Sequence, residues 1–142
     1  MRDRSAAIIV EEGKLALIKR IWDEEVYYVF PGGGIEEGET TEEAIIREVY
    51  EELGLHVQLQ KLATTVKYNG TQYFYEAIIV GGTFGNGQGE EYVKNDRKRG
   101  EYIPIWVSVK DLLNINIKPL EVGEYVYELY EDSQFIGINK KD

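Results

Sequence analysis

A short amphipathic helix is the sequence feature that most constrains the fold of this chain. Between residues 41 and 53, the apolar side chains of Ile45, Val49 and Leu53 recur at helical spacing. A helix with one apolar stripe gains most of its stability from burying that stripe against another element. The chain therefore needs a sheet or further helices to cover this face.

Both ends of this helix carry local signals. Thr40 or Thr41 can cap its start, and Glu43 lies three residues after Thr40, as in a capping box. Gly54 is a natural C-terminal stop. The preceding run Pro31-Gly32-Gly33-Gly34 predicts a loop, because proline lacks a hydrogen-bond donor and glycine permits unusual backbone angles.

Most of the remaining chain consists of β-branched and aromatic runs separated by turns. Strands are expected at residues 5–10, 15–20, 26–30, 57–67, 72–81 and 102–109, and a closing helix at 119–132. This order predicts an α+β fold with a mixed sheet and helices on the sheet faces. The length of 142 residues, without an evident linker, indicates a single domain over residues 1–142.

Composition excludes several classes of site and partner. The 16 basic and 26 acidic residues give a net charge of −10, which argues against binding to a nucleic-acid duplex. Without cysteine and with His56 as the only histidine, the chain has no disulfide, Cys-ligated zinc site or multi-His site of its own. No apolar run approaches the ~20 residues of a membrane span, so we expect no membrane partner and a cytoplasmic location.

Glutamate is concentrated around the helix: eight of the 17 residues from Glu36 to Glu52 are Glu. We expect Glu48, Glu51 and Glu52 to lie on the side of the helix opposite the apolar stripe. Like charges at this spacing destabilise an exposed helix, whereas a hard divalent cation such as Mg²⁺ or Mn²⁺ prefers carboxylate ligands. The alternative is an ordinary solvated acidic face.

The spacing of residues 33–55 decides between these alternatives. The chain reads Gly33, five residues, Glu39, seven residues, and then Arg47-Glu48-Val49-Tyr50-Glu51-Glu52-Leu53-Gly54-Leu55. This resembles the signature of the Nudix hydrolase family at all nine of its fixed positions. The resemblance implies an α/β/α sandwich with a mixed sheet, and hydrolysis of a nucleoside diphosphate linked to another group, assisted by Mg²⁺ or Mn²⁺.

The resemblance also implies roles for individual residues. Glu48, Glu51 and Glu52 would be metal ligands, and the backbone carbonyl of Gly32 or Gly33 would contribute another oxygen. A water activated by the metal would attack phosphorus, so these glutamates are the first catalytic candidates.

Arg47 and Glu39 would form the supporting part of the site. Their pairing would hold the glycine segment against the helix, as a two-point contact between guanidinium and carboxylate would. The alternative for Arg47 is a simple pair with Glu51, four residues later on the helix.

Other site residues are less strongly indicated. Glu90, Glu91 and Glu101 are candidates for the general base, although each also fits an ordinary exposed glutamate. Arg20 is a candidate phosphate contact or a surface cation at a strand end. Tyr28, with the neighbouring Tyr27 and Trp22, is a candidate for stacking on a base, although aromatic residues in strands more often belong to the core.

The substrate stays open at the level of the sequence. A nucleoside triphosphate or related small nucleotide is the default, with a diadenosine polyphosphate or a nucleotide sugar as alternatives. A non-catalytic nucleotide-binding module of the same fold is the alternative from another class, and the intact glutamates argue against it. Homodimers are common in the family, and the expected edge strands would permit one.

Overall fold

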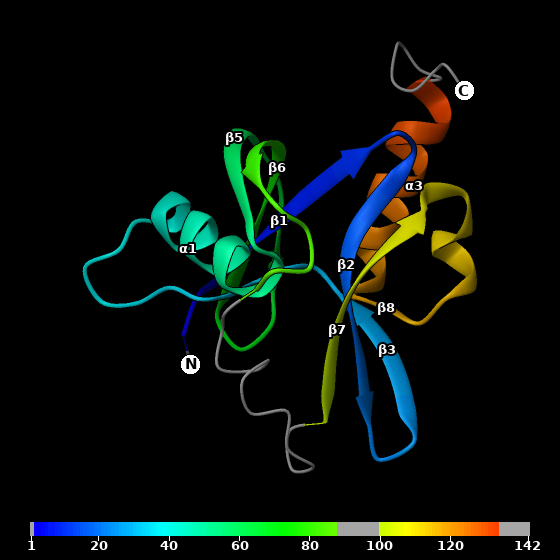
Figure 1. The fold of residues 1–142 in the computed structure, drawn as a ribbon, viewed down its shortest axis with the longest axis horizontal. Helices are drawn as coiled ribbons and strands as arrows, with labels where there is room; N and C mark the ends of the chain where they lie inside the picture. The colour runs from blue at the N-terminus through cyan, green and yellow to red at the C-terminus, as the bar shows by residue number, and fades with distance from the viewer. Residues whose placement is uncertain (1, 88–99, 134–142) are drawn as a thin grey trace.

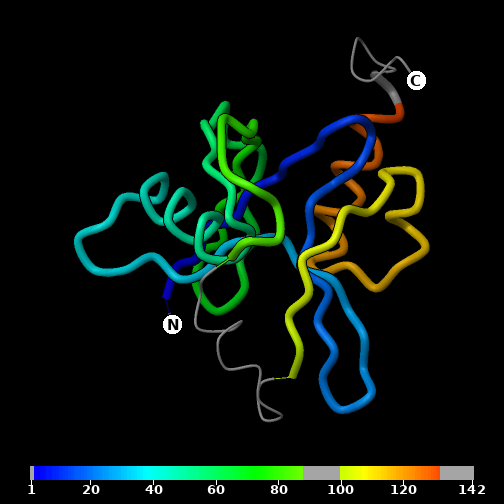
Figure 2. Tube along the Cα trace, viewed as in Figure 1, coloured from blue at the N-terminus to red at the C-terminus, as the bar shows by residue number. Residues whose placement is uncertain are grey.

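The computed structural model describes residues 2–87 and 100–133 (Figures 1 and 2). Its elements, in chain order, are β1 (Arg4–Glu11), β2 (Lys14–Trp22), β3 (Glu25–Val29), β4 (Gly32–Gly34), α1 (Thr41–Leu53), β5 (Leu55–Lys67), β6 (Thr71–Gly82), β7 (Glu101–Ser108), the 3₁₀ helix η1 (Val109–Asn114), β8 (Ile117–Lys118) and α3 (Leu120–Ser133). Neither described α-helix is both long enough and apolar enough to cross a membrane. The predicted strands and both helices are confirmed, with ends shifted by two residues or fewer.

The strands form one mixed sheet that divides into two wings. In the first wing, β1 pairs in parallel with β6 and antiparallel with β4, and β5 pairs with the outer side of β6. In the second wing, β2 lies between β3 and β7, and β3 pairs in parallel with the short β8. Among the strands of residues 2–87 and 100–133, the two wings pair with each other only at the β1–β2 hairpin, through Val10↔Leu15 and Glu11↔Lys14. They diverge from that hairpin (Figure 1).

Alternation along β1 separates two hydrophobic layers. Ala6 and Ile8 face one layer, which includes Val122 and Val126 of α3. Ala7 and Ile9 face the other layer, where the side chains of α1 pack. Helices therefore cover both faces of a mixed sheet, which confirms the predicted α/β/α sandwich.

The ends of α1 are set by the predicted caps. The Thr40 hydroxyl accepts a hydrogen bond from the Glu43 backbone N–H, and the Glu43 carboxylate accepts one from the Thr40 N–H, each at 3.0 Å. Gly54 adopts the left-handed conformation at φ 78°, and its N–H donates to the Tyr50 carbonyl at 2.9 Å. These local bonds satisfy backbone groups that a helix end leaves without partners.

The glycine segment differs from the expected loop. Residues 32–34 form the strand β4, which pairs with residues 4–6 of β1. A Cβ atom on Gly32 would clash with the carbonyl oxygen of Ser5 and with Ala6. Glycine is therefore needed here because two backbones approach closely. The sequence alone does not distinguish this requirement from the need for a flexible loop.

The expected position of Glu52 is also wrong. Instead of projecting away from the apolar stripe, Glu52 is buried with 7% exposure, next to Val49 and Leu53, which are fully buried. Glu52 follows Ile45 by seven residues, and seven steps of about 100° return to within about 20° of the starting direction. The helix therefore carries an acidic side chain at the edge of its buried face.

The two adjacent isoleucines of α1 provide a test of this packing. Ile45 is fully buried between α1 and the sheet, whereas Ile46 is 42% exposed. We expect Ile45→Ala to lower the free energy of unfolding by about 2–5 kcal/mol. The matched change Ile46→Ala should cost less than about 1 kcal/mol. Urea unfolding followed by circular dichroism measures both, and equal losses would contradict the packing of α1.

Candidate active site

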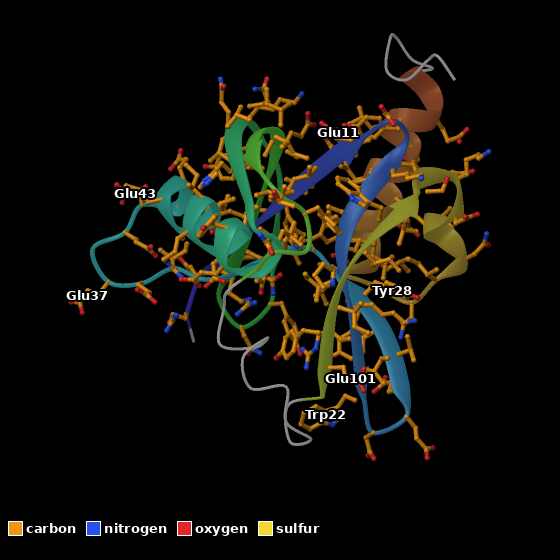
Figure 3. All side chains as sticks on the ribbon, in the orientation of Figure 1. Glu11, Trp22, Tyr28, Glu37, Glu43 and Glu101 are labelled. Carbon is orange, nitrogen blue, oxygen red and sulfur yellow. The ribbon has the colours of Figure 1, made fainter. Side chains whose placement is uncertain are left out.

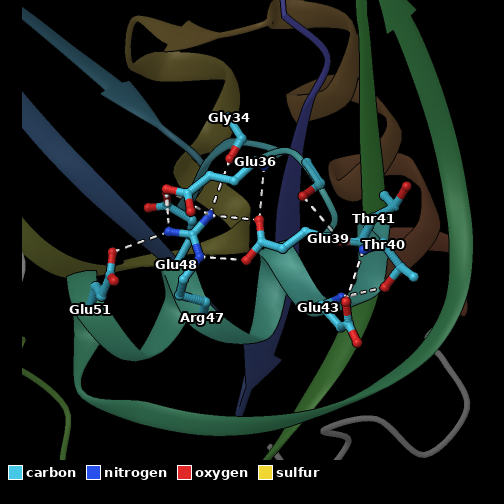
Figure 4. Close-up of polar contacts among 10 residues, drawn as sticks. Gly34, Glu36, Glu39, Thr40, Thr41, Glu43, Arg47, Glu48 and Glu51 are labelled. Carbon is cyan, nitrogen blue, oxygen red and sulfur yellow. Dashed lines mark hydrogen bonds and ion pairs between the residues drawn. The ribbon is translucent and has the colours of Figure 1, made fainter.

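Arg47 connects the helix to the segment that precedes it (Figure 4). Its Nε and Nη2 atoms donate to the two carboxylate oxygens of Glu39 at 2.6 and 3.0 Å. Its Nη1 atom donates to Glu48 at 3.0 Å and to Glu51 at 3.4 Å, and Nη2 also donates to the Gly34 carbonyl at 3.2 Å. The predicted two-point pairing of Arg47 with Glu39 is confirmed, and the contact with Glu51 exists beside it.

This pairing keeps both partners ionised. Hydrogen bonds from Arg47 are the main cause that lowers the pKa of Glu39 to about 2, and a bond from the Glu36 backbone N–H lowers it further. The bonds to Glu39 raise the pKa of Arg47 above its usual range against the effect of burial. A guanidinium that donates hydrogen bonds to three carboxylates and one carbonyl is held in one position and connects the segments that carry these groups.

The acidic side of α1 lies directly against the glycine strand. The Glu52 carboxylate accepts a buried hydrogen bond from the Gly32 N–H at 2.9 Å. Gly33 lies so close to the Glu48 carboxylate that a Cβ atom on Gly33 would meet it. Glu48 and Glu52, two of the three glutamates predicted as metal ligands, therefore meet the backbone of β4 at one place.

These groups line a cavity of about 760 Å³. Its wall includes Gly32, Gly33, Gly34, Glu48, Glu52, Arg20, Tyr27, Tyr102 and Lys118. A cavity of this volume is within the range of small-molecule sites. Glu48 and Glu52 come from α1, and Arg20, Tyr27, Tyr102 and Lys118 come from the second wing of the sheet. The wall is completed by Arg4 and Lys67 of the first wing and Glu121 of α3, among other residues.

The structure separates the two adjacent tyrosines of β3. Arg20 lines the cavity, and so does Tyr27, its cross-strand partner on β3. Tyr28 does not line the cavity; its side chain packs against the hydrophobic layer below α3. Successive residues of a strand point to opposite faces, so of these two tyrosines Tyr27, and not the predicted Tyr28, faces the cavity.

The other described acidic candidates, Glu51 and Glu101, do not line the cavity. Glu51 is 42% exposed at its side chain and does not line the cavity. Glu101 begins β7, is exposed, and lies near Trp22 at the far end of the second wing (Figure 3). The structure therefore does not bring Glu101 to the cavity. Glu90 and Glu91 lie outside the described residues.

The donor chemistry of the site fits a hard divalent cation. Carboxylate oxygens of Glu48 and Glu52 and the backbone of Gly33 are the oxygen ligands that Mg²⁺ and Mn²⁺ prefer. Within residues 2–87 and 100–133, however, no three acidic or histidine side chains are gathered as a metal centre. In this arrangement Glu48 and Glu51 are turned toward Arg47.

Two groups of the cavity wall could not be found from the sequence. Tyr102 faces the cavity because β7 pairs with β2 in a register that sets it beside Arg20. Lys118 reaches the cavity through β8, a strand of two residues. Alternation within β7 would indicate the face of Tyr102 once its pairing partner was known, but a two-residue strand leaves no periodic signal.

The pH dependence of stability tests the Arg47–Glu39 contact. Glu39 has a lower pKa in the folded chain than its ordinary value of 4.5, so its contribution is fully present above about pH 4.5. That contribution is lost as the pH falls toward about 2. Glu39→Gln should therefore be less stable than the native chain at pH 7. The difference in free energy of unfolding between the two should become smaller as the pH falls from about 4.5 toward about 2. Urea unfolding at several pH values measures it, with Glu37→Gln in the same exposed loop as control.

Comparisons with known proteins place the chain in a family. The family model of the NUDIX domain matches residues 1–129. An RNA pyrophosphohydrolase of Shewanella sediminis is 64% identical over 33 residues, which are 21% of this chain and 19% of that protein. The matched segment thus spans about a fifth of that curated relative.

Solved structures show the same fold. A NUDIX hydrolase from Nitrosomonas europaea has a TM-score of 0.71 at 19% identity, covering 90% of this chain and 88% of that one. A NUDIX-family hydrolase from Clostridium perfringens has a TM-score of 0.64 at 23% identity, covering 90% and 97%. The family match over residues 1–129 and the intact motif at residues 33–55 lead to one conclusion: this chain belongs to the Nudix hydrolase family.

Proposed function

We propose that this protein hydrolyses the pyrophosphate bond of a nucleoside diphosphate linked to another group, with Mg²⁺ or Mn²⁺ as cofactor. The observation that carries the proposal is the contact of Glu48 and Glu52 with the glycine strand, at the wall of a cavity that also holds Arg20. Acidic ligands for a cation and a basic group for phosphate occur in one space. Family membership and the name of the Shewanella relative support pyrophosphate-bond hydrolysis without defining the substrate.

The glutamates of α1 have the leading part in this proposal. Glu48, Glu51 and Glu52, with a backbone carbonyl of Gly32 or Gly33, would hold the cation. When bound there, a divalent cation offsets the negative charge of the phosphates and lowers the pKa of water. Because Glu51 now pairs with Arg47 and is exposed, binding would require this side chain to turn from the guanidinium.

Arg47 and Glu39 would act as positioning residues. Their contact fixes the Gly34 carbonyl and orients the carboxylates of Glu48 and Glu51. Arg20 would contact the phosphates from the second wing. For the general base we favour a carboxylate of α1 over Glu101, because Glu101 does not line the cavity.

The size and charge of the cavity support a small, phosphate-bearing substrate. A small nucleotide such as a nucleoside triphosphate is our first proposal, and a diadenosine polyphosphate or nucleotide sugar is the second. A binding module without catalysis would have no need for Glu48, Glu51 and Glu52 together, so we favour an enzyme.

Removing single carboxylate charges tests the metal site. We expect Glu48→Gln and Glu52→Gln each to lower activity on the order of 100-fold or more, since each deletes a charged ligand and keeps its shape. Glu52→Gln keeps an acceptor for the Gly32 N–H, so its thermal midpoint should stay near that of the native chain. Phosphate release from a panel of nucleotides, with and without Mg²⁺, measures the effect. Unchanged activity in both variants would refute the site, and Glu37→Gln is the control.

Titration with Mg²⁺ tests the positioning role of Glu39 and Arg47. We expect Glu39→Gln to weaken the apparent affinity for Mg²⁺ more than it lowers the rate at saturating Mg²⁺. Arg47→Lys should behave similarly, because lysine cannot reproduce the two-point contact with Glu39. If Glu39→Gln lowered the saturated rate as far as Glu52→Gln with unchanged Mg²⁺ affinity, Glu39 would belong to the chemistry itself.

A further inference from the structure

The last glycine of β4, Gly34, lies against a side chain from outside the motif at residues 33–55. A Cβ atom on Gly34 would clash with the Nε, Cζ and Nη2 atoms of Arg2. These three atoms belong to one planar guanidinium, so the end of the Arg2 side chain lies across Gly34 at the position that a side chain would otherwise occupy. Glycine at residue 34 therefore makes room for Arg2.

The backbone next to Arg2 is fixed on two sides. The Asp3 carbonyl accepts a hydrogen bond from the N–H of Ile35, the residue that follows β4, at 3.0 Å. The Asp3 carboxylate accepts a second bond from the Thr71 N–H, also at 3.0 Å. The segment before β1 is therefore held between the end of β4 and the start of β6, and the Arg2 side chain covers the end of β4.

The same glycine takes part in the contacts of Arg47. The Gly34 carbonyl accepts a hydrogen bond from Nη2 of Arg47 at 3.2 Å, and this nitrogen also donates to Glu39. Hydrogen bonds from Arg47 are the largest cause of the low pKa of Glu39, and the charge of Arg2 adds to their effect. Arg2 itself is not among the residues that line the cavity. Gly34 thus lies between two guanidinium groups, one at its carbonyl and one against its Cα.

We propose that Arg2 is a positioning residue, which fixes the end of β4 through Gly34 and thereby supports the cation site. The inference rests on the proposed function, since it takes a divalent cation to bind at the glutamates of α1 beside this strand. Groups that orient metal ligands without touching the metal commonly change metal affinity when they are replaced. Here the ligands are oriented by Arg47, which the Gly34 carbonyl helps to hold.

Charge and position predict opposite effects for Arg2. As one more positive charge near the carboxylates, Arg2 would weaken the binding of a divalent cation, so its removal would tighten binding. As a support for the end of β4, Arg2 strengthens that binding, so its removal should weaken it. The sign of the change in metal affinity therefore distinguishes a positioning residue from a surface cation.

Binding of Mn²⁺ to the full chain measures this sign without turnover. We expect Arg2→Gln to raise the dissociation constant for Mn²⁺, followed by electron paramagnetic resonance, about fivefold or more. Arg2→Lys keeps the charge without the planar group and should not restore the affinity. Lys14→Gln, which removes an exposed cation at the β1–β2 hairpin, is the control and should stay within about twofold. An unchanged or lower constant in Arg2→Gln would overturn the proposal.

A substitution at Gly34 tests the contact itself. Gly34 belongs to the strand β4, a conformation that alanine adopts, so the new Cβ of Gly34→Ala should displace the flexible side chain of Arg2. We expect Gly34→Ala to weaken Mn²⁺ binding to within about twofold of the effect of Arg2→Gln. The double variant should be no weaker than either single one, because both changes remove the same contact. Additive losses would refute the contact.

Hydrogen exchange tests the role of Arg2 at β4 independently of metal binding. The Ile35 N–H should exchange about tenfold faster or more in Arg2→Gln and in Gly34→Ala, because the end of β4 would open more easily. Its exchange rate should stay the same in Lys14→Gln, and an unchanged rate in Arg2→Gln would refute the proposal. Faster exchange in the Arg2 and Gly34 variants, with no Mn²⁺ binding by the native chain, would support the role of Arg2 at β4 and contradict the proposed function.

Discussion

The arrangement of the site depends on the hydrogen bonds and ion pairs that the Arg47 guanidinium makes. Breaking a partly buried ion pair costs more than breaking an exposed one, because the remaining charge loses its partner. Here one cation serves Glu39, Glu48 and Glu51 and also the Gly34 carbonyl, so it ties the segment before α1, the helix and the end of β4 together. Without it, the repulsion among the carboxylates of Glu39, Glu48 and Glu51 would lose the cation that offsets it.

The glycine strand is the second constraint, and it is steric. Gly32 lies against the backbone of β1, and Gly33 against the carboxylate of Glu48. Any side chain at either position would separate the elements that the Glu52–Gly32 hydrogen bond joins. Charge and sterics therefore act on the same few residues, which explains why fixed glycine, arginine and glutamate positions occur together in the motif at residues 33–55.

Features that depend on local sequence could be predicted, and those that depend on strand pairing could not. The bounds of α1 follow from Thr40, Glu43 and Gly54, whose bonds are all within a few residues. The Arg47–Glu39 pair follows from a motif of fixed spacing. The cavity faces of Tyr27 and Tyr28, by contrast, depend on how β3 pairs with β2, and one step of register exchanges them. The burial of Glu52 could have been predicted from the sequence, since helical geometry alone places it on the same side of α1 as Ile45.

The division of the sheet links these local features into one site. Because β1 and β2 pair at only two positions beside their turn, the strands separate and each carries its own wing. The first wing and α1 bring the carboxylates and the glycine strand, while the second wing brings Arg20 with its cross-strand tyrosines. A fully paired β1–β2 ladder would align these groups on one continuous surface. Divergence of the wings instead lets opposite charges line one cavity, while the ion pairs of Arg47 stay within α1 and the segment that precedes it. Under the proposed function, a phosphate-bearing substrate would therefore meet acidic groups suited to a cation and the cationic groups of the second wing in the same cavity.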